Sequence, residues 1–459
     1  MTNWYPVHSK LSRPAYLSLA DQIAEAIGNG TLPTGARLPP HRTLASNLKL
    51  SVQTVGRAYQ ELIRRRLIAG EVGRGSFVKL GKDLESAYLP DRVDEIINLS
   101  TLRPVCDGHH LEKMCEAFGW LADNLPPALA LSCRPNVVSP RHQKAAAEWL
   151  ALCGLDVLPI NITVTNGATA AITTALMSAV LPGGVVAAES LSHHTLVPLS
   201  TYLGVQIEGV AIDHDGMIPG ALEAVCKKNA VEAVFLQPTV ANPRTLMMSA
   251  ERREALASIA RKYDLAIIED DILGPLVENR PPPMASFAPE RTLYITSFSK
   301  ITVPSLRIGY LAAPTRFLAA VANRHLVSNW MATPSISEIA MKWVADGTAR
   351  ALVDWQRAAL ATRHAIVAKI LSGFIFRSHP QSLHVWLPLG EDQWEENFVT
   401  QARLRGVAVA PGASSHVSDE QYPAVRISIG TTTETELLTG LKIISSLAGP
   451  NFEELLLAL

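Results

Sequence analysis

The sequence predicts an α/β protein: a large body built on a mostly parallel sheet, preceded by a small, mainly helical head. In the body, short runs rich in Val, Ile and Leu alternate with helical segments, at 162–165, 185–188, 233–236, 265–268 and 293–296. Short apolar strands separated by helices are typical of a parallel sheet with both faces covered. The chain has 459 residues, which is long enough for two or more domains.

The composition excludes several classes of protein. Hydrophobic residues make up 48% and charged residues 18%, as in folded rather than disordered chains. No apolar stretch reaches the length of a membrane span, and residues 1–6 do not resemble a signal peptide. The five cysteines include no CxxC pair, so neither a disulfide framework nor a metal site is expected. We therefore expect a cytoplasmic protein with reduced thiols and no bound metal.

The charges of the chain are distributed unevenly. Residues 1–80 contain eleven Lys and Arg against four Asp and Glu, a net charge of +7, whereas the remainder carries a net charge of −8. A basic head on an acidic body indicates a polyanionic partner for the head alone. The alternative is a chance excess of charge on a small solvated domain.

The first eighty residues predict three helices and a hairpin. Apolar residues at steps of three and four indicate a first helix that ends near residues 28–30. A second helix is expected after Pro39-Pro40, and Ser51 is placed to cap a third. Two short strands, 68–72 and 76–80, follow and are joined through Gly73-Arg74-Gly75.

This order of elements is the one that lays a recognition helix in the major groove, with a hairpin wing on the adjacent backbone. Arginines are then expected at phosphates, and polar residues near the start of the third helix at base edges. The candidates are Arg42, Arg57 and Arg74, with Gly75 beside the last in the wing, and Ser51, Gln53 and Thr54. The alternative is a winged helix that binds only protein.

The motifs at residues 16–21, 30–42 and 73–78 closely resemble the winged helix-turn-helix domain of GntR-type bacterial regulators. The resemblance covers nearly all of residues 10–80 and implies a double-stranded DNA operator as partner. Gln53 departs from it, because the family often has arginine at this place.

We expect the head at 1–80, a linker at 81–95 and the body at 96–459, since residues 81–95 are polar and interrupted by Pro90. In parallel sheets, ligands bind at the C-terminal ends of the strands. Lys300 ends the apolar run 292–300, where its amine can hold an aldehyde cofactor as a Schiff base.

Other strand ends offer groups that suit such a cofactor. The turn 165–169 opens a helix whose N–H groups can receive a phosphate, and Arg307 can pair with the same phosphate. Asn242, before Pro243, can donate to a phenolate oxygen. Asp270 can keep a pyridine nitrogen protonated, although a helix cap is an equal alternative. Arg426 lies in an apolar run and needs an anion, which a ligand or the protein itself can provide.

In this order the pieces resemble the fold-type I pyridoxal-phosphate (PLP) enzymes, the aspartate aminotransferase superfamily, over residues 96–459. The resemblance implies a mostly parallel sheet, a smaller C-terminal subdomain, PLP as cofactor and a homodimer. By resemblance, Lys300 forms the imine, Asp270 binds the pyridine nitrogen, Asn242 binds the ring hydroxyl, Arg426 binds a substrate carboxylate, and Asn166, Gly167, Ala168, Ser297, Ser299 and Arg307 surround the phosphate.

Three positions depart from the superfamily. Leu273 fills the place of a tyrosine that usually bonds the ring oxygen. His193 lies where an aromatic residue usually stacks on the ring, and the alternative is an exposed loop histidine. Segment 131–138 lacks the usual tyrosine and glycine of a loop that reaches the partner subunit. A looser cofactor, or a pocket reshaped for another ligand, is expected.

A GntR head on an aminotransferase-like body is the layout of the MocR subfamily of regulators, which the chain resembles along its whole length. We therefore expect a homodimeric, PLP-dependent transcriptional regulator that senses PLP, or an amine or amino acid. One alternative is a catalytically active aminotransferase fused to a DNA-binding domain. Another is a regulator whose pocket holds a ligand without a covalent bond.

Overall fold

The computed structural model describes residues 4–8, 11–29, 31–32, 36–65, 67–71, 75–78, 96–131, 139–390, 394–418 and 422–449. The chain divides into two compact units, Met1–Val93 and Asp94–Leu459. The expected linker 81–95, Arg74 and residues 132–138 lie outside the described residues. Among the helices that are described, none has the length and apolar character needed to cross a membrane.

The N-terminal unit contains three helices followed by a two-stranded hairpin, as the sequence predicts. Apolar side chains from all three helices form its core, among them the fully buried Leu19, Leu44 and Val55. The hairpin is antiparallel and pairs Ile68 with Val78. The elements are α1 (Ala15–Gly28), α2 (His41–Leu48), α3 (Val52–Arg64), β1 (Ile68–Glu71) and β2 (Gly75–Val78).

The turn between α2 and α3 has a defined start and end. Lys49 ends α2 in the left-handed conformation, with φ of 51°. Ser51 then caps α3, because its Oγ accepts the N–H of Thr54 at 3.0 Å. This cap satisfies one of the N–H groups that the first helical turn leaves without a partner. The predicted capping role of Ser51 is confirmed.

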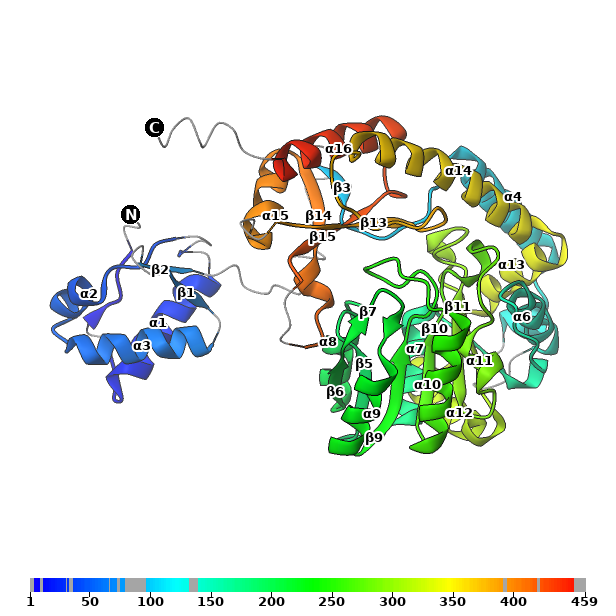
Figure 1. The fold of residues 1–459 in the computed structure, drawn as a ribbon, viewed down its shortest axis with the longest axis horizontal. Coiled ribbons are helices and arrows are strands. Elements are labelled where there is room, and N and C mark those ends of the chain that lie inside the picture. Colours follow the sequence, from blue (N-terminus) through cyan, green and yellow to red (C-terminus); the bar gives the residue numbers. More distant parts are fainter. Residues whose placement is uncertain are drawn as a thin grey trace. The chain divides into compact units, whose positions relative to one another are not determined.

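The C-terminal unit is built on a seven-stranded sheet in the order β4-β12-β11-β10-β9-β5-β6 (Figure 1). β12 runs antiparallel to β11 and β4, and the other neighbouring pairs are parallel. The predicted fold class is confirmed. The strands are β4 (Ile162–Thr165), β5 (Val185–Glu189), β6 (Gln206–Val210), β9 (Val231–Leu236), β10 (Ala266–Asp270), β11 (Thr292–Ser297) and β12 (Gly309–Ala312).

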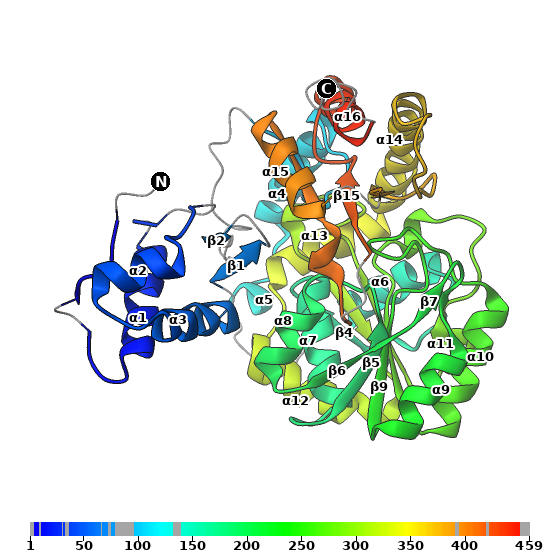
Figure 2. The same ribbon diagram turned by 60° about the vertical axis from the view of Figure 1, so that its left-hand side comes forward.

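Helices cover both faces of this sheet (Figure 2). Alternate strand residues point to opposite faces, so Val186 and Ala188 pack with α7, α8 and α12, whereas Ala187 packs with α9, α10 and α11. Since both faces are covered by apolar side chains, the open edge at the ends of the strands is where polar groups can gather. The helices are α7 (Ala168–Ala179), α8 (Leu196–Leu203), α9 (Pro219–Lys228), α10 (Ala250–Lys262), α11 (Met284–Phe287) and α12 (Thr315–Asn329).

A second sheet of four strands, in the order β13-β15-β14-β3, forms a smaller subdomain with α14, α15 and α16 (Figure 1). β3 comes from the start of the unit and pairs in parallel with β14. The elements are β3 (Ile97–Leu99), α14 (Thr348–Ile370), β13 (His384–Pro388), α15 (Glu395–Leu404), β14 (Val407–Pro411), β15 (Ala424–Ser428) and α16 (Glu434–Ala448). The C-terminal unit also contains α4 (Gly108–Asn124), α5 (Pro127–Ala130), α6 (Pro140–Leu152), β7 (Ile212–Asp213), β8 (Gly216–Met217) and α13 (Pro334–Ala345).

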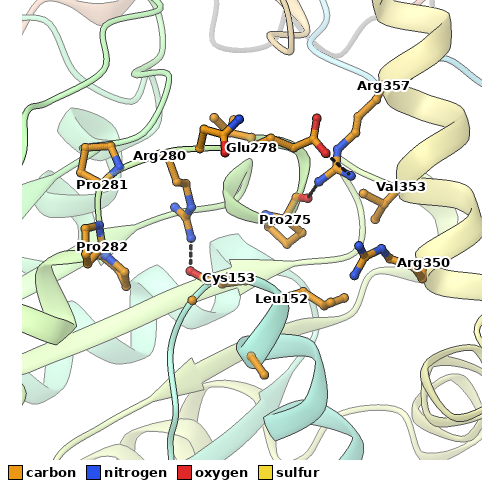
Figure 3. Close-up of a pocket in the computed structure, with 15 residues that line it drawn as sticks. Leu152, Cys153, Pro275, Glu278, Arg280, Pro281, Pro282, Arg350, Val353 and Arg357 are labelled. Atoms are coloured by element: carbon orange, nitrogen blue, oxygen red, sulfur yellow. Dashed lines mark hydrogen bonds and ion pairs between the residues drawn. The ribbon is translucent and has the colours of Figure 1, made fainter.

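A buried ion pair joins the loop after β10 to the body of the unit. Arg280 Nη1 lies 2.5 Å from Oδ2 of Asp271, which also accepts the hydroxyl of Tyr294 at 2.5 Å. The Arg280 side chain is 7% exposed and that of Asp271 is 0% exposed. In Figure 3, Arg280 reaches the backbone carbonyl of Cys153 across a cavity of about 540 Å³ that lies between this loop and α14. Lys300 does not line this cavity.

Replacing Arg280 with alanine should destabilise the C-terminal unit by about 3–5 kcal/mol, because the Asp271 carboxylate would remain buried without its cation. Urea unfolding of the full chain, followed by tryptophan fluorescence, measures this change. The matched control is Arg350→Ala, which removes an exposed arginine of the same cavity wall and should change stability by less than about 0.5 kcal/mol. Equal effects of the two substitutions would contradict the structural role of the pair.

Candidate functional site

The register of the central strands brings several polar residues to one edge of the sheet. β10 lies between β9 and β11, with Glu269 opposite Leu236 and Asp270 opposite Ile295. Gln237 is the next residue after β9 and is therefore beside Asp270. Lys300 follows the end of β11 by three residues. The predicted gathering of polar groups at the strand ends is what this register produces.

The three consecutive acids after β10 have different partners. Glu269 accepts the N–H groups of Met284 and Ala285, at 2.8 and 3.0 Å, and so caps the start of α11. Asp271 pairs with Arg280. Asp270 accepts only the side-chain amide of Gln237, at 2.8 Å, and its buried Oδ1 has no partner among the described residues. The helix-cap alternative therefore applies to Glu269, and the structure leaves Asp270 with an atom for a ligand.

Lys300 is held in a turn that begins at Ser297. The hydroxyl of Ser297 donates to the carbonyl of Ile308 at 2.9 Å and accepts the N–H of Ser299 at 3.1 Å. Lys300 Nζ donates to the carbonyl of Leu102 at 2.6 Å. Burial, together with the neighbouring guanidinium groups of Arg426, Arg307 and Arg103, lowers the pKa of Lys300 to about 8, while the Asp270 carboxylate acts in the opposite direction. An amine with this pKa is partly neutral near pH 7.

Arg426, on β15, holds Asn242 in place. Its Nη1 donates to Asn242 Oδ1 at 2.9 Å, and its Nη2 donates to the carbonyl of Ser100 at 2.7 Å. The Nδ2 of Asn242 is buried with no hydrogen-bond partner in the described part of the chain, and so is Nε of Arg426. Burial lowers the pKa of Arg426 to about 10. The amide donor predicted for a phenolate oxygen is thus present and free.

The start of α7 lies against Arg307. Gly167 has a φ of 86°, which favours glycine over residues with a Cβ, and a Cβ at this position would lie 2.8 Å from Arg307 Nη2. α7 has no side-chain cap, which leaves N–H groups from Ala168 onward without an intrahelical partner. Ser299 Oγ is buried and has no partner within the described residues. Ala168, Ser299 and the exposed Arg307 therefore offer donors to a phosphate.

Two of the residues predicted at the phosphate, Asn166 and Ser297, also form hydrogen bonds within the protein. Asn166 donates to the carbonyl of Met331 at 3.3 Å and accepts the N–H of Thr333 at 3.2 Å. The hydroxyl proton of Ser297 is directed to Ile308. The amide group of Asn166 keeps a second N–H, whereas Ser297 has only the one hydroxyl proton, which Ile308 accepts.

His193 lies in the loop after β5. Its ring is 4.6 Å from that of His194, and its Nδ1 is bonded to the hydroxyl of Thr195 at 2.8 Å. Burial lowers the pKa of His193 well below its usual range, with further effects from His194, Lys300 and Arg426. The imidazole of His193 is neutral and half-buried near Lys300 and Arg426, so it is able to stack on the ring of a bound ligand.

Sequence reasoning did not identify Gln237, Arg103 or the carbonyl of Leu102. Gln237 follows a strand directly and carries the same signal as Asp270, so it could have been found. A backbone carbonyl has no signal in the sequence. Leu273, by contrast, is buried in the main core as the departure from tyrosine suggested, and it provides no hydroxyl to the site.

The buried polar atoms without partners are the clearest property of this site. Buried polar groups are normally hydrogen-bonded, and here an acceptor on Asp270 and donors on Asn242 and Ser299 have no partner in the described residues. A pyridine ring that carries a hydroxyl, an aldehyde and a phosphate has groups that can bond to these atoms and to the Lys300 amine. The residues present fit PLP.

Most of the DNA candidates lie near the starts of α2 and α3: Arg42 in the first turn of α2, and the others from the N-cap to the second turn of α3. Arg42, Gln53 and Arg57 are exposed, and the guanidinium of Arg57 lies 4.0 Å above the ring of Tyr16. The hydroxyls of Ser51 and Thr54 bond each other at 2.8 Å, so they serve the helix cap first. Gly75 begins β2 opposite Glu71, and Arg74 lies outside the described residues.

Comparison with known proteins identifies both parts of the chain. The family model for aminotransferase class I and II matches residues 130–444, and that for bacterial regulatory proteins of the gntR family matches residues 15–78.

Three similar proteins illustrate the relationship. The chain is 29% identical to the HTH-type transcriptional regulator YdeF of Bacillus subtilis, over 97% of this chain and 96% of YdeF. It is 28% identical to the vitamin B6 salvage pathway transcriptional repressor PtsJ of Salmonella typhimurium, over 91% of this chain and 95% of PtsJ. The structure of an archaeal alanine:glyoxylate aminotransferase superposes with a TM-score of 0.72 and 25% identity, over 80% of this chain and 94% of that one. The chain therefore belongs to the aminotransferase class I and II family and, with its GntR-family N-terminal domain, has the layout of the MocR-type transcriptional regulators.

Proposed function

We propose that this protein is a transcriptional regulator that binds operator DNA through residues 1–80 and binds PLP at Lys300 in the body, residues 96–459. Its affinity for the operator changes with PLP itself, or with an amine or amino acid that reacts with the bound cofactor. It acts as a homodimer in the cytoplasm, where the operator is. Coupling requires that the ligand favours one arrangement of the DNA-binding units over another.

The observation that carries the proposal is the set of unpartnered buried atoms around Lys300. When bound, PLP supplies an electron-withdrawing ring and an aldehyde that captures amines. Three side chains of the protein would hold the cofactor. Oδ1 of Asp270 would accept the N–H of the protonated ring nitrogen, Nδ2 of Asn242 would donate to the ring oxygen, and Arg307 would pair with the phosphate.

The name of PtsJ supports a link between this layout and vitamin B6, since that relative is a repressor of a vitamin B6 salvage pathway. Arg426 supports an effector with a carboxylate, because its buried Nε has no partner in the described part of the unit. The identity of the amine and the operator sequence do not follow from these contacts.

A working aminotransferase is the second candidate, and the structural neighbour of the C-terminal unit favours it. Lys300, Asp270 and Arg426 are the residues that this chemistry would use. Against it stands Leu273, a buried aliphatic residue that cannot support the ring oxygen. Steady conversion of an amino acid to its keto acid by the purified protein would favour the enzyme over the regulator.

Lys300→Ala should abolish the visible absorbance that PLP acquires on binding, because the Lys300 amine is the group that forms the Schiff base in this proposal. The spectrum of purified protein titrated with PLP measures this. Lys369→Ala, which changes an exposed lysine of α14, serves as the control and should leave the spectrum unchanged. A full band in the Lys300 variant would overturn the assignment.

The rate of PLP capture should rise with pH and level off above about pH 8, because the neutral amine is the nucleophile and the pKa of Lys300 is lowered to about 8. Between pH 6 and 7 the neutral fraction of such an amine grows roughly tenfold. Stopped-flow absorbance measures the rate. A rate that still climbs tenfold per unit beyond pH 9 would show that the amine has an ordinary pKa.

Arg57→Ala should weaken operator binding roughly tenfold and reduce the slope of log affinity against log salt by about one, because one phosphate contact is lost. Fluorescence anisotropy with labelled operator DNA at several salt concentrations provides both values. Arg350→Ala, in the C-terminal unit, is the control. An unchanged salt slope in the Arg57 variant would remove this arginine from the DNA interface.

A further inference from the structure

The hydrogen bond between Gln237 and Asp270 is the least explained contact of the site. Nε2 of Gln237 lies 2.8 Å from Oδ2 of Asp270, and the two residues are 4% and 2% exposed. The contact follows from the register of β9 and β10, which ends the two strands side by side. Neither the sequence motifs nor the proposed function gives Gln237 a role.

Asp270 has no other hydrogen bond in the described part of the chain. Its neighbour Asp271 is committed to Arg280, and the Lys300 amine donates to the carbonyl of Leu102. A carboxylate rotates freely about its last bond unless something fixes one oxygen. Gln237 fixes Oδ2, and this leaves Oδ1 as the oxygen that a ligand can reach.

The backbone around Gln237 is itself rigid. Its N–H donates to the buried Glu189 at 3.3 Å. The backbone carbonyl of the next residue, Pro238, accepts hydrogen bonds from Arg253 Nη2 at 2.8 Å and from the N–H of Met248 at 3.0 Å. Because its backbone is held in this way, the Gln237 side chain can keep the Asp270 carboxylate within a narrow range of positions.

The contact also acts on the charge of Asp270. Burial raises the pKa of Asp270 to about 7, and the hydrogen bond from Gln237 opposes this rise. Of the charged groups around it, Asp271 raises the pKa and Lys300 lowers it. An amide N–H donor stabilises the carboxylate over the neutral acid, and only the carboxylate can hold a ring nitrogen in its protonated form.

We propose that Gln237 is a positioning residue for Asp270: by binding Oδ2, it directs Oδ1 toward the ligand and favours the ionised carboxylate. This inference rests on the proposed function for its consequence, the protonation of the ring nitrogen of PLP. The effect of Gln237 on Asp270 itself does not depend on the proposed function, because the hydrogen bond is present in the protein without cofactor.

The test compares Gln237→Met, which keeps the volume and loses the donor, with Gln356→Met on α14. Gln356 is also a fully buried glutamine, and it lies outside the site, so it controls for the loss of a buried amide. Circular dichroism verifies that both variants fold. Gln237→His, which retains a ring N–H donor, should fall nearer to the wild-type protein.

Two measurements follow. In the cofactor-free protein, carbon NMR of the aspartate carboxyl groups, assigned with Asp270→Asn, should show that Gln237→Met raises the pKa of Asp270 by about one pH unit. With PLP labelled with nitrogen-15 in its ring, Gln237→Met should shift the resonance toward the unprotonated nitrogen and weaken binding roughly tenfold. Gln356→Met should change neither.

An Asp270 pKa that is the same in Gln237→Met and in the wild-type protein overturns the inference. A wild-type protein that binds no PLP overturns the proposed function, while a raised pKa in the cofactor-free variant still supports the positioning role. The two failures are therefore distinguishable.

Discussion

The parallel pairing of β9, β10 and β11 is the constraint on which the site depends. It ends three buried strands at one edge, so that residues far apart in the chain, Gln237, Asp270 and Lys300, become neighbours. The sheet is covered on both faces by apolar side chains, and Gln237 and Asp270 are buried at this edge. Polar atoms left there without partners are costly unless a ligand meets them. The site is therefore built to be completed by a bound group.

The lysine amine depends on the same enclosure. Burial and three nearby arginines lower the pKa of Lys300, while those arginines also offer contacts to an anionic cofactor and effector. One arrangement thus makes the amine reactive and the pocket selective for anions. In the proposed site, the absence of a hydroxyl at Leu273 would leave Asn242 to support the ring oxygen, and Arg426 donates a hydrogen bond to Asn242 Oδ1. A ligand carboxylate at Arg426 would act on the same amide, which links effector and cofactor in a short chain of contacts.

Much of the fold could be predicted from the sequence because its signals are local. The helices of the N-terminal unit follow from apolar periodicity and from the Ser51 cap, and the strands of the body follow from short apolar runs. Lys300, Asp270 and Asn242 could be proposed because each lies within a few residues of the end of such a run. The contact of Lys300 with Leu102, and the use of Asn166 by Met331 and Thr333, could not, since they join segments more than 160 residues apart. Ser297 shows the same limit, because its partner Ile308 is set by the pairing of β11 with β12.

The central claim is that the amine of one lysine holds a B6 aldehyde covalently at this strand end. Borohydride reduction of the protein after incubation with PLP, followed by peptide mass spectrometry, tests it most directly. The account predicts one pyridoxyl group per chain, on the peptide that contains Lys300. Labelling spread over surface lysines, with the Lys300 peptide unmodified, would contradict it.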